Sequence, residues 1–313
     1  MTGLVADPVF RKHLAPPGHP EHEGRMQALL DWALPLKGDP RILWIDPRPA
    51  TREEIETVHE PEYFSAIAAT AGRELSLDPD TYTSPHSYET ALGAAGSCID
   101  LVDAVLDGRA SNGIALIRPP GHHAETNRAM GFCLFNNVAV AAAHARQRGL
   151  NRVLIVDWDV HHGNGTQQIF EEDPSVYFVS LHQYPFYPGT GAASEMGRGA
   201  GEGFTLNIPL RAGCGDFDYV KRFQEKVVPV GIQFRPDLVL ISAGFDAHAR
   251  DPLGGMRVTT PGFAQLADEL LGLARETCGG KIVAILEGGY DLLALRNSVE
   301  AVANRFFEEG ARP

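Results

Sequence analysis

The stretch RVLIVDWDVHHGNG, from Arg152 to Gly165, carries the clearest structural signal in the sequence. Its opening part, Arg152 to Val156, holds an apolar, β-branched run without alternation, which predicts a strand buried on both faces of a parallel sheet. Successive side chains of a strand point to opposite sides, so Asp157, Asp159 and His161 are expected to share one side. The same spacing on a helix would scatter them. The stretch therefore predicts a metal site at the end of a buried strand.

The composition is that of a globular α/β protein. The chain has 313 residues, of which 44% are hydrophobic and 21% are charged, which is enough to bury a large core. Such a core could belong to one α/β domain or to two smaller ones, and we expect a single domain over residues 1–313. The formal net charge of -13 argues against a nucleic-acid partner, and Lys and Arg form no run that would offset it.

The cysteines and the N-terminal segment predict a cytoplasmic protein. The cysteines at positions 98, 133, 214 and 278 form no CxxC pair and have no regular spacing, which favours reduced thiols over a disulfide framework. Residues 1–25 lack the apolar run of an export signal. No stretch approaches the roughly 20 apolar residues of a membrane span, so no membrane partner is expected.

Apolar runs alternate with helical patterns along the chain, which predicts a parallel sheet with helices between its strands. The predicted strands are 41–45, 113–117, 152–156, 176–181, 204–208, 237–241 and 281–286. The predicted helices are 53–71, 87–106, 137–148, 217–233, 261–277 and 291–309.

Unusual polar residues follow four of the predicted strands. These segments are 118–123, 157–164, 242–248 and 287–290. Each alone has an ordinary explanation, such as a helix cap or a turn. Ligands of open parallel sheets bind beyond the carboxyl ends of the strands, so we expect the four segments to converge on one crevice.

Three residues in these segments form a candidate ligand set for zinc. Asp159, His161 and Asp246 supply one imidazole and two carboxylates, which leaves positions open for water and substrate, as a catalytic site requires. Two anionic ligands neutralise the dication, so water bound there should be less acidic than under three neutral imidazoles. A protein base is then needed.

The adjacent His122 and His123 are the candidate bases. Asp157 and Asn164 are available to hold their second ring nitrogens and to set the tautomers. The alternative for Asp157 is a strand-end cap or a ligand of a monovalent cation. Tyr290 follows two glycines that allow a close approach, and its hydroxyl could donate to a developing oxyanion. The alternative for Tyr290 is a packing role.

Six motifs together resemble one enzyme family. They are RPPGHHA (118–124), GFCLFNN (131–137), DWDVHHGNGT (157–166), SLHQYPFYPGTG (180–191), SAGFDAHARDPLGG (242–255) and EGGY (287–290). In this order they resemble the histone deacetylase and acetylpolyamine amidohydrolase family, most closely its class II branch. The resemblance implies the arginase-deacetylase fold, a single α/β domain with a parallel eight-stranded sheet and helices on both faces. It also implies a zinc-dependent hydrolase that removes acetyl or related acyl groups from amines.

The resemblance implies a role for each matching residue. It assigns Asp159, His161 and Asp246 as zinc ligands, and His122 and His123 as the tandem pair. His123 would be the main general base and acid, and Tyr290 would polarise the acyl carbonyl. Asn164 stands where class I members have an aspartate beside the second histidine, so the resemblance leaves an acidic partner only for His122.

The same resemblance implies two potassium sites and a substrate channel. The inner potassium site would comprise Asp157, Asp159, His161, Ser180 and Leu181, and the outer one Phe170, Asp173, Val176 and Phe204. The channel wall would include Gly131, Phe132, Tyr187 and Leu253, with Tyr187 where the family usually has a second phenylalanine. Arg25 resembles an arginine of the internal channel that passes acetate.

Alternative functions are separated by single positions. Arginase-like enzymes need further carboxylates for a second metal, and here those positions are Gly163 and His248, which argues against that class. Polyamine-selective relatives carry a glutamate where this chain has Leu253, so acyl-lysine in proteins or peptides is the favoured substrate. An acetylpolyamine deacetylase is the alternative. A catalytically silent acyl-lysine binder is disfavoured because the full catalytic set is present.

Overall fold

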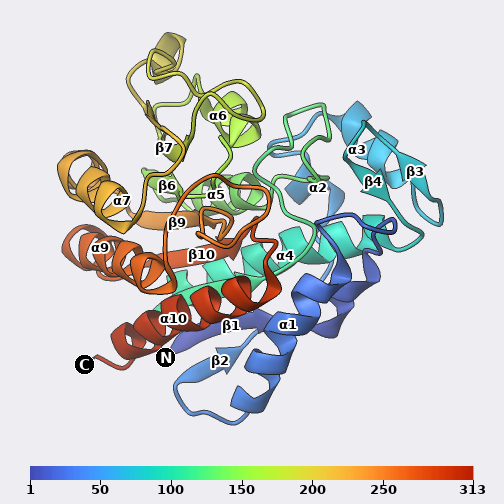
Figure 1. The fold of residues 1–313 in the computed structure, drawn as a ribbon, viewed down its shortest axis with the longest axis horizontal. Helices are drawn as coiled ribbons and strands as arrows, with labels where there is room; N and C mark the ends of the chain where they lie inside the picture. The colour runs from blue at the N-terminus through green and yellow to red at the C-terminus, as the bar shows by residue number, and fades with distance from the viewer. Residues whose placement is uncertain (313) are drawn as a thin grey trace.

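The computed structural model describes residues 1–312, whose main element is a parallel eight-stranded sheet with helices on both faces (Figure 1). The strands are β1 (Thr2–Ala6), β2 (Ile42–Trp44), β5 (Asn112–Leu116), β6 (Val153–Asp157), β7 (Val176–Gln183), β8 (Thr205–Leu210), β9 (Leu238–Ala243) and β10 (Ile282–Leu286). Their order across the sheet is β2-β1-β5-β10-β9-β6-β7-β8, and neighbouring strands are parallel. The predicted sheet and fold class are confirmed.

Strand β6 shows why the sheet forms from this sequence. All residues of Val153–Asp157 are buried, and β6 pairs with β9 on one side and with β7 on the other. Its branched side chains meet helices on both faces, so the lack of alternation reflects burial on both sides. The prediction of a doubly buried strand is confirmed.

Two helical layers cover the sheet. On one face, α4 (Ser87–Leu106) packs against α5 (Asn137–Gln147). On the other face, α10 (Leu292–Gly310) packs between α9 (Thr260–Cys278) and α1 (Glu23–Ala33) (Figure 1). The helical run 216–234 continues this layer beside α9 as α7 (Asp216–Arg222), a π-helical turn (Phe223–Val227) and α8 (Val228–Phe234).

The remaining elements are short. They are the helices α2 (Arg52–Ile55), α3 (Pro61–Ala68) and α6 (Asn164–Phe170), the 3-10 turns Pro8–Lys12, Leu34–Leu36 and Gly199–Gly201, and the antiparallel pair β3 (Leu75–Ser76) and β4 (Tyr82–Thr83). The β3–β4 connection carries Asp80 toward the carboxyl edge of the main sheet, where it lines the cavity described below.

One predicted helix was wrong, and some elements of the structure were not predicted. The single helix predicted over 53–71 is two helices, because Pro61 lacks an N–H and the preceding Glu60 is extended, with ψ at 143°. Strand β1 and helices α1 and α6 were not predicted. Strand β1 is fixed by long-range contacts, since the Thr2 hydroxyl donates to the Phe306 carbonyl and the Met1 ammonium donates to the Gly310 carbonyl.

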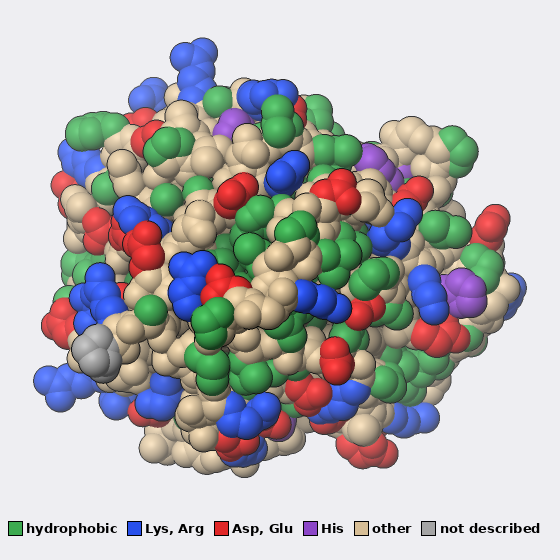
Figure 2. Space-filling view, turned by 90° about the horizontal axis from the view of Figure 1, so that it is seen from below, with side chains coloured by type: hydrophobic (Ala, Val, Ile, Leu, Met, Phe, Trp, Pro, Cys, Tyr) green, Lys and Arg blue, Asp and Glu red, His purple; other side chains and the backbone are tan. Residues whose placement is uncertain are grey.

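The surface carries charges of both signs. On the face drawn in Figure 2, Lys and Arg side chains are interspersed with Asp and Glu rather than gathered into one basic patch. Within residues 1–312, no helix is both long enough and apolar enough to cross a membrane.

Candidate active site

The four polar segments converge at the carboxyl edge of the sheet. They follow β5, β10, β9 and β6, which are four adjacent strands at the centre of the strand order. A cavity opens at this edge, and its wall includes His122, His123, His161 and Tyr290. The crevice expected from the sequence is therefore present, built by loops that are far apart along the chain.

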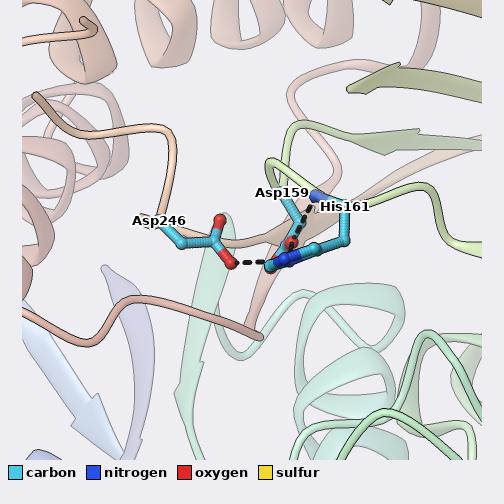
Figure 3. A group of neighbouring side chains, drawn as sticks. All are labelled: Asp159, His161 and Asp246. Atoms are coloured by element: carbon cyan, nitrogen blue, oxygen red, sulfur yellow. Dashed lines mark hydrogen bonds and ion pairs between the residues drawn. The ribbon is translucent and has the colours of Figure 1, made fainter. Parts of the chain in front are cut away.

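Asp159, His161 and Asp246 point toward one another in this crevice (Figure 3). The His161 Nδ1 atom lies 3.1 Å from Asp159 Oδ1 and 3.2 Å from Asp246 Oδ2. Backbone N–H groups hold the remaining carboxylate oxygens, since Gly288 donates to Asp159 Oδ2 at 2.9 Å and Val160 donates to Asp246 Oδ1 at 2.8 Å. These contacts fix both carboxylates before any metal binds.

Two glycines allow the backbone to approach this close. A Cβ atom on Gly244 would lie 2.1 Å from Asp159 Oδ2, and one on Gly288 would lie 2.1 Å from Asp246 Oδ2. Any larger residue at either position would push a carboxylate out of the cluster. The glycines of the SAGFD and EGGY segments are therefore needed for the site to form.

The electrostatics of the cluster favour a cation. Burial and the charge of the neighbouring Asp159 together raise the pKa of Asp246 to about 7, although the contact with His161 lowers it. Burial alone would lower the pKa of His161, but its contacts with Asp159 and Asp246 raise that pKa to about 10. Two buried carboxylates thus draw positive charge onto the imidazole between them. The donor set fits a divalent metal, which would replace the proton on the imidazole.

The tandem histidines lie beside this cluster with different partners. The His122 Nδ1–H donates to Asp157 Oδ2 at 2.9 Å, and the His123 Nδ1 atom lies 2.7 Å from Asn164 Oδ1. Burial alone would lower the pKa of His122, but the charges of Asp157 and Asp159 raise it well above its usual range. These effects favour a cationic His122.

The neighbouring imidazole has the opposite environment. Burial holds the pKa of His123 well below its usual range, and the charges of His122 and His161 lower it further. The two rings are only 4.0 Å apart between centroids, so a charge on one disfavours a charge on the other. The neutral His123 can therefore accept a proton, and the cationic His122 beside it can stabilise negative charge.

Tyr290 lines the same cavity and is held through its backbone. Its N–H donates to Asp251 Oδ2 at 2.6 Å, and the other oxygen of Asp251 accepts the N–H of Leu253 at 2.9 Å. The Arg25 guanidinium lies 5.0 Å from the centre of the Tyr290 ring. Burial raises the pKa of Tyr290, which keeps its hydroxyl protonated and able to donate a hydrogen bond.

The predicted channel residues line the same cavity. Gly131, Phe132, Tyr187 and Leu253 all belong to its wall. A Cβ atom on Gly131, whose φ is 55°, would lie 2.3 Å from the His123 ring, so only glycine fits there. Phe132 also has a positive φ of 70°, and its N–H donates to the Thr81 hydroxyl at 3.1 Å.

The residues predicted for potassium lie in two places. Asp157 and Ser180 are register partners on β6 and β7, next to Leu181 and to the Asp159–His161 segment. Phe170, Asp173 and Val176 share the turn between α6 and β7, where the Phe170 and Asp173 carbonyls accept the N–H groups of Asp173 and Val176. The carbonyl of Phe204 accepts the N–H of Phe178 beside that turn.

Two further residues named in the sequence analysis are not among those that line the cavity. Arg25 is buried, and its guanidinium donates to Glu21 and to the carbonyls of Glu287 and Gly289. His248 does not belong to the lining and stacks instead on Phe263, with ring centroids 6.4 Å apart.

Four acidic residues at the site were not assigned from the sequence. Asp80 lines the cavity, and Asp251 holds Tyr290 and Leu253. Glu287 accepts the N–H groups of Gly121 and His122, at 2.7 and 3.2 Å, and burial raises its pKa to about 7. Glu125 accepts from the Asn164 amide. Glu287 stands in the EGGY motif and Glu125 directly follows RPPGHHA. Their places in or beside these motifs are the sequence signal that could have identified both residues.

Comparisons with known proteins agree with this architecture. A family model described as the histone deacetylase domain matches residues 19–306, and the chain belongs to the histone deacetylase family. The crystal structure of the HDA15 HD domain matches with a TM-score of 0.94 and 44% sequence identity, covering 98% of this chain and 90% of that chain. The arginase-deacetylase fold expected from the resemblance is thereby confirmed.

Two curated relatives show the range of the family. Histone deacetylase 15 of Arabidopsis thaliana is 48% identical over 292 residues, which cover 91% of this chain and 52% of that protein. The polyamine deacetylase HDAC10 of Homo sapiens is 45% identical over 307 residues, which cover 94% of this chain and 45% of that protein. The chain thus spans about half the length of these two relatives.

Proposed function

We propose that this protein is a zinc-dependent deacetylase that hydrolyses the side-chain amide of acyl-lysine in proteins or peptides and releases acetate. The observation that carries the proposal is the Asp159–His161–Asp246 cluster, which shares one cavity with the tandem histidines and Tyr290. A binder would need the cavity but not this complete set of proton-transfer and oxyanion groups. Membership of the histone deacetylase family supports the same reaction class.

Zinc held by Asp159, His161 and Asp246 would supply Lewis acidity toward the acyl carbonyl and the attacking water. The neutral His123 accepts the proton of that water. The Tyr290 hydroxyl donates to the oxyanion as the tetrahedral centre forms, and the cationic His122 adds positive charge nearby. The protonated His123 then donates this proton to the leaving amine, which yields acetate and a free amine.

Potassium ions are proposed as structural partners of this site. The inner ion would take oxygen ligands around Asp157, Ser180 and Leu181, beneath the zinc-binding segment. The outer ion would take carbonyl oxygens of the turn from Phe170 to Val176 and of Phe204. Hard cations favour such oxygen sets. The cytoplasmic location is a further proposal, supported by the four cysteines, all free thiols in the described chain.

Acyl-lysine is the proposed substrate because the cavity wall presents Leu253 rather than a carboxylate at that position. A second candidate is an acetylated polyamine. It is favoured by the Asp80 side chain on the same wall, whose carboxylate could pair with a distant ammonium, and by the similarity to a polyamine deacetylase. The ratio of kcat/KM values on the two substrates decides between them.

The zinc site itself is tested by Asp159→Ala. We expect this variant to lose bound zinc, measured by elemental analysis, together with deacetylation, because one anionic ligand and its hold on His161 are gone. Asp39→Ala, which removes a carboxylate paired with Arg41 at the surface, is the matched control and should retain both. A fully zinc-loaded, active Asp159→Ala protein would refute the ligand set.

A further inference from the structure

The side chain of Asn164 connects His123 to a carboxylate. Asn164 Oδ1 lies 2.7 Å from His123 Nδ1, and Asn164 Nδ2 lies 2.8 Å from Glu125 Oε1. A carboxylate accepts hydrogen bonds and an amide nitrogen donates them, so the amino group of Asn164 must face Glu125. The amide oxygen must then face His123. Met130 Sδ, 3.4 Å from the same amide nitrogen, is a weak acceptor and agrees with this orientation.

The orientation of the amide determines the tautomer of His123. Because Asn164 presents its oxygen, the neutral imidazole must carry its proton on Nδ1. The Nε2 atom then keeps its lone pair. This is the form of the ring that can accept a proton from water at Nε2. The tautomer of the proposed base is therefore determined by Glu125, which contacts His123 only through Asn164.

Glu125 itself is held in place from both sides. The His59 Nδ1–H donates to the Glu125 carbonyl at 2.9 Å, and His59 Nε2 accepts the N–H of Asn136 at 2.9 Å. The Glu125 N–H donates to the Arg128 carbonyl at 3.0 Å. Among the ion pairs of residues 1–312, none includes Glu125, and its side chain accepts a hydrogen bond from Asn164. The carboxylate is therefore directed at the amide rather than at a surface cation.

We propose that Glu125 is a positioning residue for the general base, orienting His123 through Asn164. The proposal rests on the function proposed above, in which His123 takes the proton of the attacking water. The two histidines then differ in their partners. His122 contacts a carboxylate directly, and His123 contacts one through the amide of Asn164. The amide transmits orientation and polarisation to His123 without placing a full negative charge against it.

The test is a double-mutant cycle of Glu125→Ala and Asn164→Asp. In the natural background, Glu125→Ala frees the amide to rotate, and we expect kcat to fall about 10-fold, as for other partners of site histidines, with KM unchanged. In the Asn164→Asp background, the new carboxylate accepts directly from His123 and repels Glu125. Glu125→Ala should then raise kcat relative to Asn164→Asp alone. A change in kcat that is a loss in one background and a gain in the other would show that Glu125 acts on His123 through Asn164.

Glu60→Ala is the matched control. Glu60 accepts from the Asn127 amide at 3.1 Å, as Glu125 does from Asn164, but that amide leads to no histidine of the site. Its loss should leave kcat unchanged. An equal loss of kcat from Glu125→Ala in both backgrounds, or no loss in either, would overturn the proposal.

A second readout does not depend on turnover. Nitrogen NMR of the ring of His123 in the metal-free protein should show the Nδ1–H tautomer in the natural chain and a mixture in Glu125→Ala. An unchanged tautomer in Glu125→Ala would contradict the action of Glu125 on His123 through Asn164. If the natural chain has no deacetylase activity but its tautomer responds to Glu125, the proposed function fails and the positioning role stands.

Discussion

Tyr290 is the residue whose neighbours most clearly define its chemistry. The Asp251 carboxylate holds its backbone, the Arg25 guanidinium lies near its ring, and burial raises its pKa. Its hydroxyl therefore stays protonated, on a residue that lines the cavity. A donor that is fixed before the reaction stabilises an oxyanion without reorganisation at the moment of attack.

Replacing Tyr290 with phenylalanine should remove this donor and little else. We expect Tyr290→Phe to lower kcat by about 10²-fold or more, as for the loss of one oxyanion donor. Zinc content and the melting temperature should match those of the natural protein, since the backbone contact to Asp251 is kept. Turnover at the natural rate in this variant would remove Tyr290 from the mechanism.

Leu253 is the residue whose change should alter the substrate. It lines the cavity, and the N–H that it donates to Asp251 does not depend on its side chain. Leu253→Glu should raise the kcat/KM ratio of acetylated polyamine over acetyl-lysine peptide, because a carboxylate there can meet a distant ammonium. Leu253→Gln controls for size and polarity. Equal ratios in both variants would show that charge at this position does not select the substrate.

At the scale of elements, the strands and their polar ends followed from local sequence, and the connections between loops did not. The run Arg152 to Val156 predicted β6 to within one residue at each end. Strand β1 was missed because its five residues are held by partners near positions 42, 112 and 306. The helix predicted over 53–71 ignored the effect of Pro61.

The site shows the same division. The segments that meet in the cavity could be predicted, because each follows an apolar run and carries its own polar residues. The carboxylates that support them could not, because Glu125 meets Asn164, and Asp251 meets Tyr290, from 39 residues away. Such contacts depend on how the loops are packed and leave no periodic pattern in the sequence.

His59 links the turn between α2 and α3 to the loop that carries Glu125, and it predicts a pH dependence. Burial lowers the pKa of His59 to about 4 from its ordinary value of 6.5. Below the ordinary value the unfolded chain takes up a proton that the folded chain does not, so this histidine costs stability as the pH falls toward the folded pKa. Above the ordinary value it costs nothing.

The comparison of the natural protein with His59→Gln isolates this residue, because other titrating groups are common to both. The free energy of unfolding of the natural protein should decline relative to the variant as the pH falls from about 6.5 to about 4, by up to about 1.4 kcal/mol per pH unit. Denaturant unfolding at several pH values measures the difference. Parallel curves would mean that the pKa of His59 is the same in the folded and the unfolded chain, which contradicts the lowering by burial.

At the scale of the whole molecule, the candidate zinc site links the central strands. Asp159 follows β6, Asp246 follows β9, and the Gly288 N–H that holds Asp159 follows β10. A metal bound there contacts only the folded arrangement of these loops. Its binding energy therefore adds to the stability of the whole sheet rather than to one loop.

Zinc should accordingly raise the melting temperature. At free zinc about 100 times its dissociation constant, the folded state gains about 2.7 kcal/mol relative to the metal-free protein. A chelator should reverse the gain, and Asp159→Ala should show no zinc dependence. Identical melting curves with zinc and with chelator would contradict a site built by the folded sheet.

The most direct test of the central claim is steady-state turnover of the purified, zinc-loaded protein on acetyl-lysine peptides and acetylated polyamines, with a chelated control. We predict release of acetate that the chelator abolishes, with the larger kcat/KM on the peptide. A larger value on the polyamine would overturn the substrate assignment while leaving the chemistry intact. No turnover on either substrate, with zinc bound, would contradict the proposed deacetylase.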